Sequence, residues 1–121
     1  TNRDRTDNSG GRSSKVTVDI NAEKGFNPDT VTIENQQTVT WYNSTTIYHT
    51  VTADEDGIPD QAEYFASGGF KRELSANIIY TIEGGLEDGN SFSHTFETPG
   101  QYKYYSIPSR DNGVVGTVIV E

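Results

Sequence analysis

Few side chains in this 121-residue chain could take part in catalysis or hold a transition metal. The chain has no Cys and no Met, which excludes disulfides, iron–sulfur clusters and cysteine nucleophiles. It has two His, and Ser106 and Ser109 lie in a C-terminal loop that is rich in Ser, Pro, Asn and Gly. A Ser paired with His49 could form a hydrolase site, but no nucleophile-elbow motif surrounds either Ser and no acidic residue is placed to orient the imidazole. The sequence therefore predicts that the protein is not an enzyme.

The second histidine, His94, lies in a segment where apolar and polar residues alternate. Phe92 and Phe96 are on the same side of such a strand as His94, so we expect its ring to face the core. This placement favours a half-buried histidine with a hydrogen-bond partner. A metal ligand that pairs with His49 is the alternative.

Oxygen donors gather in the acidic segment 52–63. Aligned on Gly57, this segment reads as a twelve-residue calcium loop. The donors at its third, fifth, seventh, ninth and twelfth positions would be Asp54, Asp56, the Ile58 carbonyl, Asp60 and Glu63. The first position is Thr52 rather than Asp, and no flanking helices are predicted. A calcium site and a solvated acidic turn are therefore both open interpretations.

The overall charge limits the partners that the chain can bind. Its net charge of -9 argues against nucleic acid, because phosphate binding needs clustered Lys or Arg and the longest basic cluster is the pair Lys71 and Arg72. No apolar run approaches the ~20 residues that cross a bilayer, so we predict no membrane span. The chain begins at Thr1 without an initiator Met. We expect a processed or truncated product, in which a removed signal peptide or N-terminal lipid anchor would leave no trace.

The elements that position these residues are predicted to be short strands. Residues 1–15 contain no aliphatic or aromatic residue, which predicts a disordered tail or linker before a single domain at 16–121. Within this domain, alternation at the two-residue period of a half-buried strand marks seven segments: 16–20, 31–33, 38–43, 49–52, 92–96, 102–105 and 115–120. About seven or eight such strands, with turn signals between them, indicate an all-β fold, an antiparallel β-sandwich.

The stretch between residues 65 and 90 is ambiguous. Ile78, Tyr80 and Ile82 alternate as in a strand, whereas residues 75–79 could form a helical turn. We also expect residues 22–28 to form a turn, because Gly25 supplies backbone freedom and Pro28 fixes φ.

Five short motifs follow one another along the chain in an order that is typical of a known family. They are Phe26-x-Pro28, Val39-x-Trp41-x-Asn43, His49-Thr50-Val51, Phe96-x-x-Pro99-Gly100-x-Tyr102 and Gly116. Together they resemble the plastocyanin/halocyanin branch of the cupredoxins, the small blue copper proteins, over nearly all of residues 16–121. The resemblance implies a Greek-key sandwich of the cupredoxin type. The chain departs from the family at 78–88, which looks like an insertion, and at Asn35 and Gln36, where the family usually has Gly.

In cupredoxins, copper is held by a His on one strand and by a Cys, a His and a Met on or beside a C-terminal loop. The resemblance places His49 at the first position, and Ser106, Ser109 and Val114 at the other three. It therefore implies a lost type 1 copper site and no expected cofactor. Asn43 matches the Asn that ties the His strand to the Cys loop through hydrogen bonds.

Two functions are consistent with this resemblance. The first is an extracytoplasmic module, periplasmic, cell-surface or secreted, that lacks type 1 copper and binds an unknown protein partner or has a structural role. The alternative is an electron-transfer copper protein in a ligand-stripped form. In that case Tyr105, on the outward face beside the Cys position, would join the acidic residues in a docking surface for a redox partner.

Overall fold

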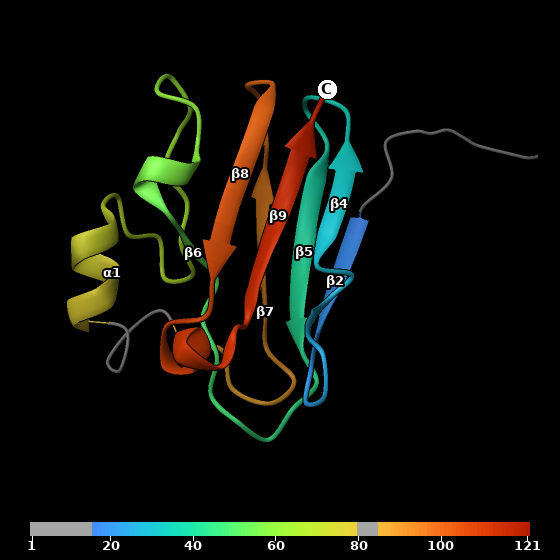
Figure 1. The fold of residues 1–121 in the computed structure, drawn as a ribbon, viewed down its shortest axis with the longest axis vertical. Helices are drawn as coiled ribbons and strands as arrows, with labels where there is room; N and C mark the ends of the chain where they lie inside the picture. The colour runs from blue at the N-terminus through green and yellow to red at the C-terminus, as the bar shows by residue number, and fades with distance from the viewer. Residues whose placement is uncertain (1–15, 80–84) are drawn as a thin grey trace, which may run out of the picture.

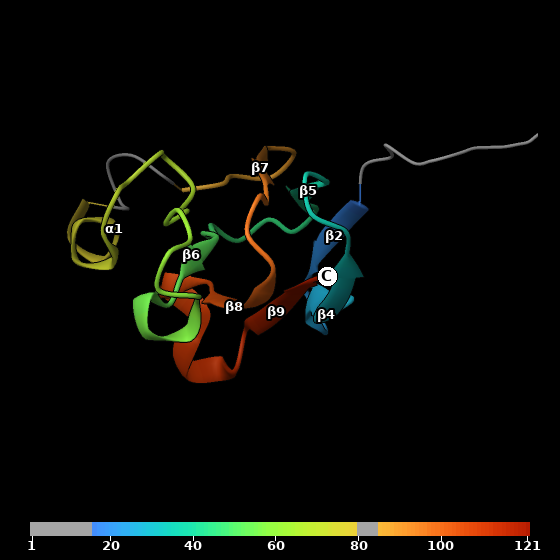
Figure 2. The ribbon, with the colours of Figure 1, turned by 90° about the horizontal axis from the view of Figure 1, so that it is seen from above.

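The computed structural model describes residues 16–79 and 85–121, which form two β-sheets packed face to face (Figures 1 and 2). The predicted tail at 1–15 and the ambiguous residues Tyr80 and Ile82 lie outside the described residues. One sheet has the order β3-β2-β5-β7 and the other the order β4-β9-β8-β6. The predicted all-β sandwich is confirmed. None of the helices in the described residues is long and apolar enough to span a membrane.

The strand boundaries follow the alternation in the sequence closely. The first sheet contains β2 (Val16–Asn21), β3 (Gly25–Asn27), β5 (Thr38–Asn43) and β7 (Ser91–Thr95). The second contains β4 (Thr30–Ile33), β6 (Thr52–Ala53), β8 (Gly100–Tyr105) and β9 (Val115–Val120). Two expectations were wrong. Segment 22–28 contains a short strand, and of segment 49–52 only Thr52 belongs to one, while His49 forms an isolated bridge with Leu86.

The sheets are mixed, which corrects the prediction of a wholly antiparallel sandwich. β2 pairs with β5 in parallel, and β4 pairs with β9 in parallel, whereas the other pairs are antiparallel. The period of a strand identifies which of its residues face the core, but it says nothing about the direction of the neighbouring strand. The two parallel pairs therefore could not be predicted from alternation.

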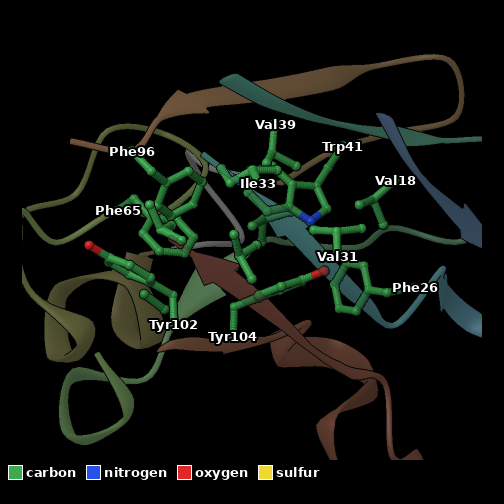
Figure 3. Close-up of a cluster of buried hydrophobic side chains, with 14 of the residues drawn as sticks. Val18, Phe26, Val31, Ile33, Val39, Trp41, Phe65, Phe96, Tyr102 and Tyr104 are labelled. Atoms are coloured by element: carbon green, nitrogen blue, oxygen red, sulfur yellow. The ribbon is translucent and has the colours of Figure 1, made fainter. Parts of the chain in front are cut away.

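Aromatic side chains from both sheets meet between the layers (Figure 3). Trp41 is fully buried, with its ring stacked at 5.8 Å on Phe65 and edge-on at 5.2 Å to Tyr104. Tyr102 and Tyr104 also point inward from β8. Because side chains alternate along a strand, the next inward position is Ser106, at the point where β8 ends. The core therefore fixes the direction of the Ser106 side chain.

Short helical segments cover one edge of the sandwich and one of its ends. α1 (Glu73–Ile79) lies beside β6 and β8, and η2 (Glu55–Gly57) and η3 (Ile107–Asn112) lie in the loops that flank β8. Residues 75–79 are therefore helical, as one interpretation of this stretch predicted. Of the three residues that alternate as in a strand, only Ile78 is among the described residues, and it lies in the helix with 66% of its surface exposed.

Candidate functional site

The site is built around a hydrogen bond between Ser106 and His49. The Nδ1 atom of His49 lies 2.9 Å from the Ser106 hydroxyl oxygen, and the backbone amide of Thr50 donates to the same oxygen at 3.1 Å. The hydroxyl oxygen accepts a hydrogen bond from the amide and keeps its own proton for donation to Nδ1 when the imidazole proton is on Nε2. In the other tautomer, Nδ1–H donates to the second lone pair of the same oxygen. The imidazole is neutral in both arrangements. Burial supports this state, because it lowers the pKa of His49 below 6.5.

The loop after Ser106 is fixed by backbone hydrogen bonds. The amide of Ser106 donates to the Val114 carbonyl at 3.0 Å, and the amide of Ser109 donates to the Ser106 carbonyl at 3.1 Å. The amide of Ile107 donates to the Thr50 hydroxyl at 2.9 Å, which ties the loop to the segment that carries His49. These bonds hold the two ends of the loop side by side.

A surface pocket of about 310 Å³ brings three of the four residues at the predicted copper positions together. His49, Ser109 and Val114 line it, while Ser106 is fully buried behind them. Val114 packs closely on Gly25, where an added Cβ would lie 3.2 Å from its Cγ1 atom. These three positions thus offer one imidazole, one hydroxyl and one aliphatic side chain where a soft metal would need nitrogen and sulfur ligands.

Asn43 anchors the opposite side of this site. Its side-chain amide is fully buried and donates to the carbonyls of Ile47 and Leu86 at 2.8 and 2.7 Å. Its side-chain oxygen accepts from both the amide and the hydroxyl of Thr45, at 2.9 and 2.8 Å. Both N–H groups and the oxygen of the buried side-chain amide therefore have hydrogen-bond partners. Leu86 also exchanges backbone hydrogen bonds with His49, so Asn43 holds the segments on both sides of the imidazole.

His94 does not join this site. Its ring stacks on Phe65 at 4.9 Å and meets Phe96 edge-on at 4.8 Å, which confirms that it faces the core. In the sheet it is paired with Val39, near the start of β5, whereas His49 follows the end of that strand. Its pKa is lowered by burial, against the opposing charges of Glu63 and Glu97. The structure therefore does not bring the two imidazoles together.

The acidic segment 52–63 forms a capped turn. The side chain of Asp54 accepts the amide hydrogen of Asp56 at 3.0 Å, and Glu55 pairs with Arg72 at 2.8 Å. Within residues 16–79 and 85–121, no group of three or more His, Asp or Glu side chains is placed to hold a metal ion. Calcium binding by this segment stays a prediction, and calorimetry with millimolar calcium is its test, because an absence of heat would rule it out.

Tyr105 corrects the expectation of an open outward-facing ring. It does lie on the outer face of β8, but it is only 3% exposed because α1 and η3 cover it. Its hydroxyl donates to Glu73 at 2.6 Å and accepts from Asn77 at 2.8 Å, while the Arg110 guanidinium lies 4.4 Å from the ring centre. Burial raises the pKa of Tyr105 to about 12. Alternation along the sequence correctly predicted that Tyr105 lies on the outer face of β8. It gave no indication that α1 covers this side chain.

This sandwich and its loop match a known family of copper proteins. The sequence model of the copper-binding proteins of the plastocyanin/azurin family matches residues 12–121. The chain belongs to this family. As a cupredoxin it is unusual in composition, because it has no Cys and no Met and so lacks both sulfur ligands of a type 1 copper site.

Plastocyanins are among the relatives of this cupredoxin in sequence. Plastocyanin of Scenedesmus fuscus is 34% identical over 109 residues, which cover 88% of this chain and 99% of that protein. The chloroplastic plastocyanin of Chlamydomonas reinhardtii is 32% identical over 109 residues, covering 88% of this chain and 67% of that protein. These matches extend over nearly the whole described domain.

Solved cupredoxin structures share the fold. A purple cupredoxin from Nitrosopumilus maritimus has a TM-score of 0.58 at 25% identity, covering 88% of this chain and 99% of that one. A pseudoazurin from Sinorhizobium has a TM-score of 0.64 at 18% identity, covering 88% of this chain and 73% of that one. At such identities the structural likeness establishes the sandwich and nothing about its ligands.

Thr50 is the functional residue that the sequence did not reveal. Its amide and its hydroxyl both contact the C-terminal loop, and its hydroxyl also lies 3.0 Å from that of Thr52. In the sequence it belongs to a strand-like run and to the motif His49-Thr50-Val51, neither of which indicates its contacts with the C-terminal loop. The signal that could have identified it is its place directly after the histidine, where its amide must be satisfied by the residue at the predicted Cys position, Ser106.

Proposed function

We propose that this protein is an extracytoplasmic cupredoxin that has lost its type 1 copper site and acts as a binding or structural module. In this proposal Ser106, Ser109 and Val114 occupy the positions of the missing Cys, His and Met. The observation that carries it is the bond between Ser106 and His49. The Ser106 hydroxyl meets both the imidazole nitrogen and the Thr50 amide, so the centre of the site is satisfied by protein atoms alone.

The chemistry of the donors supports the same conclusion. A serine hydroxyl stays protonated at neutral pH and is a hard, weak ligand, whereas type 1 copper depends on a thiolate. His49 is buried and uses its Nδ1 atom for Ser106. A single imidazole in this arrangement offers copper no more than an ordinary histidine does. The location outside the cytoplasm is part of the proposal and rests on the resemblance to exported members of the family.

Electron transfer by a ligand-stripped form is the second candidate, and membership in the plastocyanin/azurin family favours it. Against it, the side chain that would face a redox partner, Tyr105, is covered by α1 and Arg110. This candidate therefore needs both a restored metal site and a displaced helix.

An absorption spectrum recorded after addition of copper(II) tests the proposal. We expect no intense visible charge-transfer band from the chain as it is. The combined variant Ser106→Cys, Ser109→His and Val114→Met should produce the band, because it restores a thiolate, a second imidazole and a thioether.

The matched control is the double variant Ser109→His and Val114→Met, which should remain colourless because it has no thiolate. A strong visible band from the unmodified chain would contradict the loss of the copper site. A colourless but folded triple variant would show that these three residues are not at the ligand positions.

A further inference from the structure

A groove of about 320 Å³ lies on the outer face of β8 and β9, away from the pocket that His49 lines. Two cross-strand pairs point into it, Lys103 with Thr117 and Tyr105 with Val115. Asp54 and Arg110 complete its lining from the flanking loops. Its volume is within the usual range for small-molecule sites, about 300–1,000 Å³.

The floor and one side of the groove are held by specific contacts. The hydroxyl of Tyr105 is fixed by Glu73 and Asn77 of α1, and its ring carries the Arg110 guanidinium at 4.4 Å. On the other side, η2 packs so closely on β8 that a Cβ at Gly57 would lie 2.9 Å from Cβ of Lys103. The groove therefore exists before any ligand binds.

The charge in the groove is opposite to that of the whole chain. The chain has nine Lys and Arg against eighteen Asp and Glu, yet two of those nine cations line this groove, against one carboxylate. Lys103 and Arg110 are exposed, and neither forms an ion pair with any side chain that the structure describes. The one carboxylate in the lining, Asp54, accepts the amide hydrogen of Asp56.

An apolar contact lies beside these cations. Val115 is 51% exposed on the same face, and the aromatic ring of Tyr105 lies below. Arginine and lysine can each bind a carboxylate through charge-assisted hydrogen bonds. The strongly acidic remainder of the chain repels extended polyanions, so the occupant must carry its negative charge at one end.

We propose that this groove binds a small carboxylate that has an apolar body. The carboxylate lies between Lys103 and Arg110, and the apolar body lies on Val115. This inference names the ligand class of the binding module proposed above. It does not depend on copper chemistry, so the copper spectra and the carboxylate titration can fail separately.

The test is a titration of the ¹⁵N-labelled chain with 3-phenylpropionate, followed by amide chemical shifts. We expect saturable shifts at Lys103 and at Val115 to Thr117. The neutral amide, 3-phenylpropionamide, has the same shape without the charge and should bind at least tenfold more weakly. Inorganic phosphate, which lacks the apolar body, should also bind more weakly than 3-phenylpropionate.

Substitutions locate the site. Lys103→Gln and Arg110→Gln should each weaken binding at least fivefold, whereas Lys71→Gln, an exposed lysine that does not line the groove, should leave it unchanged. Each variant is compared by its amide spectrum, so a misfolded variant is recognised directly. The proposal is overturned if the amide binds as well as the acid, if shifts do not saturate, or if Lys71→Gln weakens binding as much as Lys103→Gln.

Discussion

The hydroxyl of Ser106 lies 2.9 Å from Nδ1 of His49, and both side chains are buried. A buried polar group that loses its partner costs more free energy than an exposed one, because water cannot replace the lost bond. The two residues therefore depend on each other, and the hydrogen bond between them contributes to the stability of the fold.

Replacing Ser106 tests that dependence. We expect Ser106→Ala to lower the free energy of unfolding by about 2 kcal/mol, because it leaves the Thr50 amide and His49 Nδ1 without a partner. Urea denaturation measures the change. Ser109→Ala, in the same loop but half-exposed, is the control and should stay within about 0.5 kcal/mol of the parent. Equal losses in the two variants would contradict the role given to Ser106.

Stability should fall as the pH drops below about 6.5, the ordinary pKa of histidine. Burial lowers the pKa of His49 and His94, so the unfolded chain takes up protons at a higher pH than the folded one. Each histidine then lowers the free energy of unfolding by up to about 1.4 kcal/mol for each pH unit below 6.5, until the pH reaches the pKa of that histidine in the folded chain. Urea midpoints between pH 8 and pH 5.5 measure it.

The variant His49→Asn is the control for that pH dependence. The asparagine side-chain oxygen can take the place of Nδ1 as an acceptor for Ser106, but it does not titrate. A shallower fall of stability with decreasing pH is therefore expected. A slope identical to that of the parent chain would show that His49 does not contribute.

The hydroxyl of Tyr105 should hold α1 against the sandwich. Tyr105→Phe removes its bonds to Glu73 and Asn77, and we expect a loss of about 1–2 kcal/mol in the free energy of unfolding. Amide hydrogen exchange should accelerate in α1 more than in β8. Tyr42→Phe, at a tyrosine that is 41% exposed on β5, is the matched control and should change neither quantity. Unchanged exchange in α1 would rule out this anchoring role.

Gln36 has a backbone conformation that glycine adopts more readily than other residues do. Its φ is +72°, which is rare for a residue with a Cβ, and its side chain is exposed. We expect Gln36→Gly to raise the free energy of unfolding by up to about 1 kcal/mol, since the strain exceeds the entropy that glycine loses on folding. Gln101→Gly, near the start of β8, should instead lower it by a similar amount. Thermal unfolding separates the two outcomes, and destabilisation by both would show that position 36 carries no strain.

The sequence predicted much of the fold because alternation is a local property. β5 and β9 have the predicted boundaries, and Ser106 faces inward because Tyr102 and Tyr104 do. The family resemblance placed Asn43 in a buried hydrogen-bonded position, and its four side-chain bonds fit that expectation.

What could not be predicted depends on contacts between distant segments. Nothing in residues 73–79 indicates that this helix covers Tyr105, because the bonds that hold it join residues about thirty positions apart. The partner of Ser106 is likewise set by the tertiary fold, since Thr50 is 56 residues away in sequence. The groove on β8 and β9 also escaped notice, because Lys103 and Arg110 are isolated cations in the sequence.

The parallel pairing of β4 with β9 has a consequence for how the chain acquires its structure. β9 is the last strand in sequence, yet it lies between β4 and β8 in its sheet. During synthesis, β4 therefore leaves the ribosome long before β9 has been made. Until β9 pairs with it, Val31 and Ile33 lack their final packing partners and are exposed to solvent. Folding that depends on such distant pairings is slow compared with that of helical domains. Factors that shield nascent β-strands should therefore affect the yield of this protein more than its final stability.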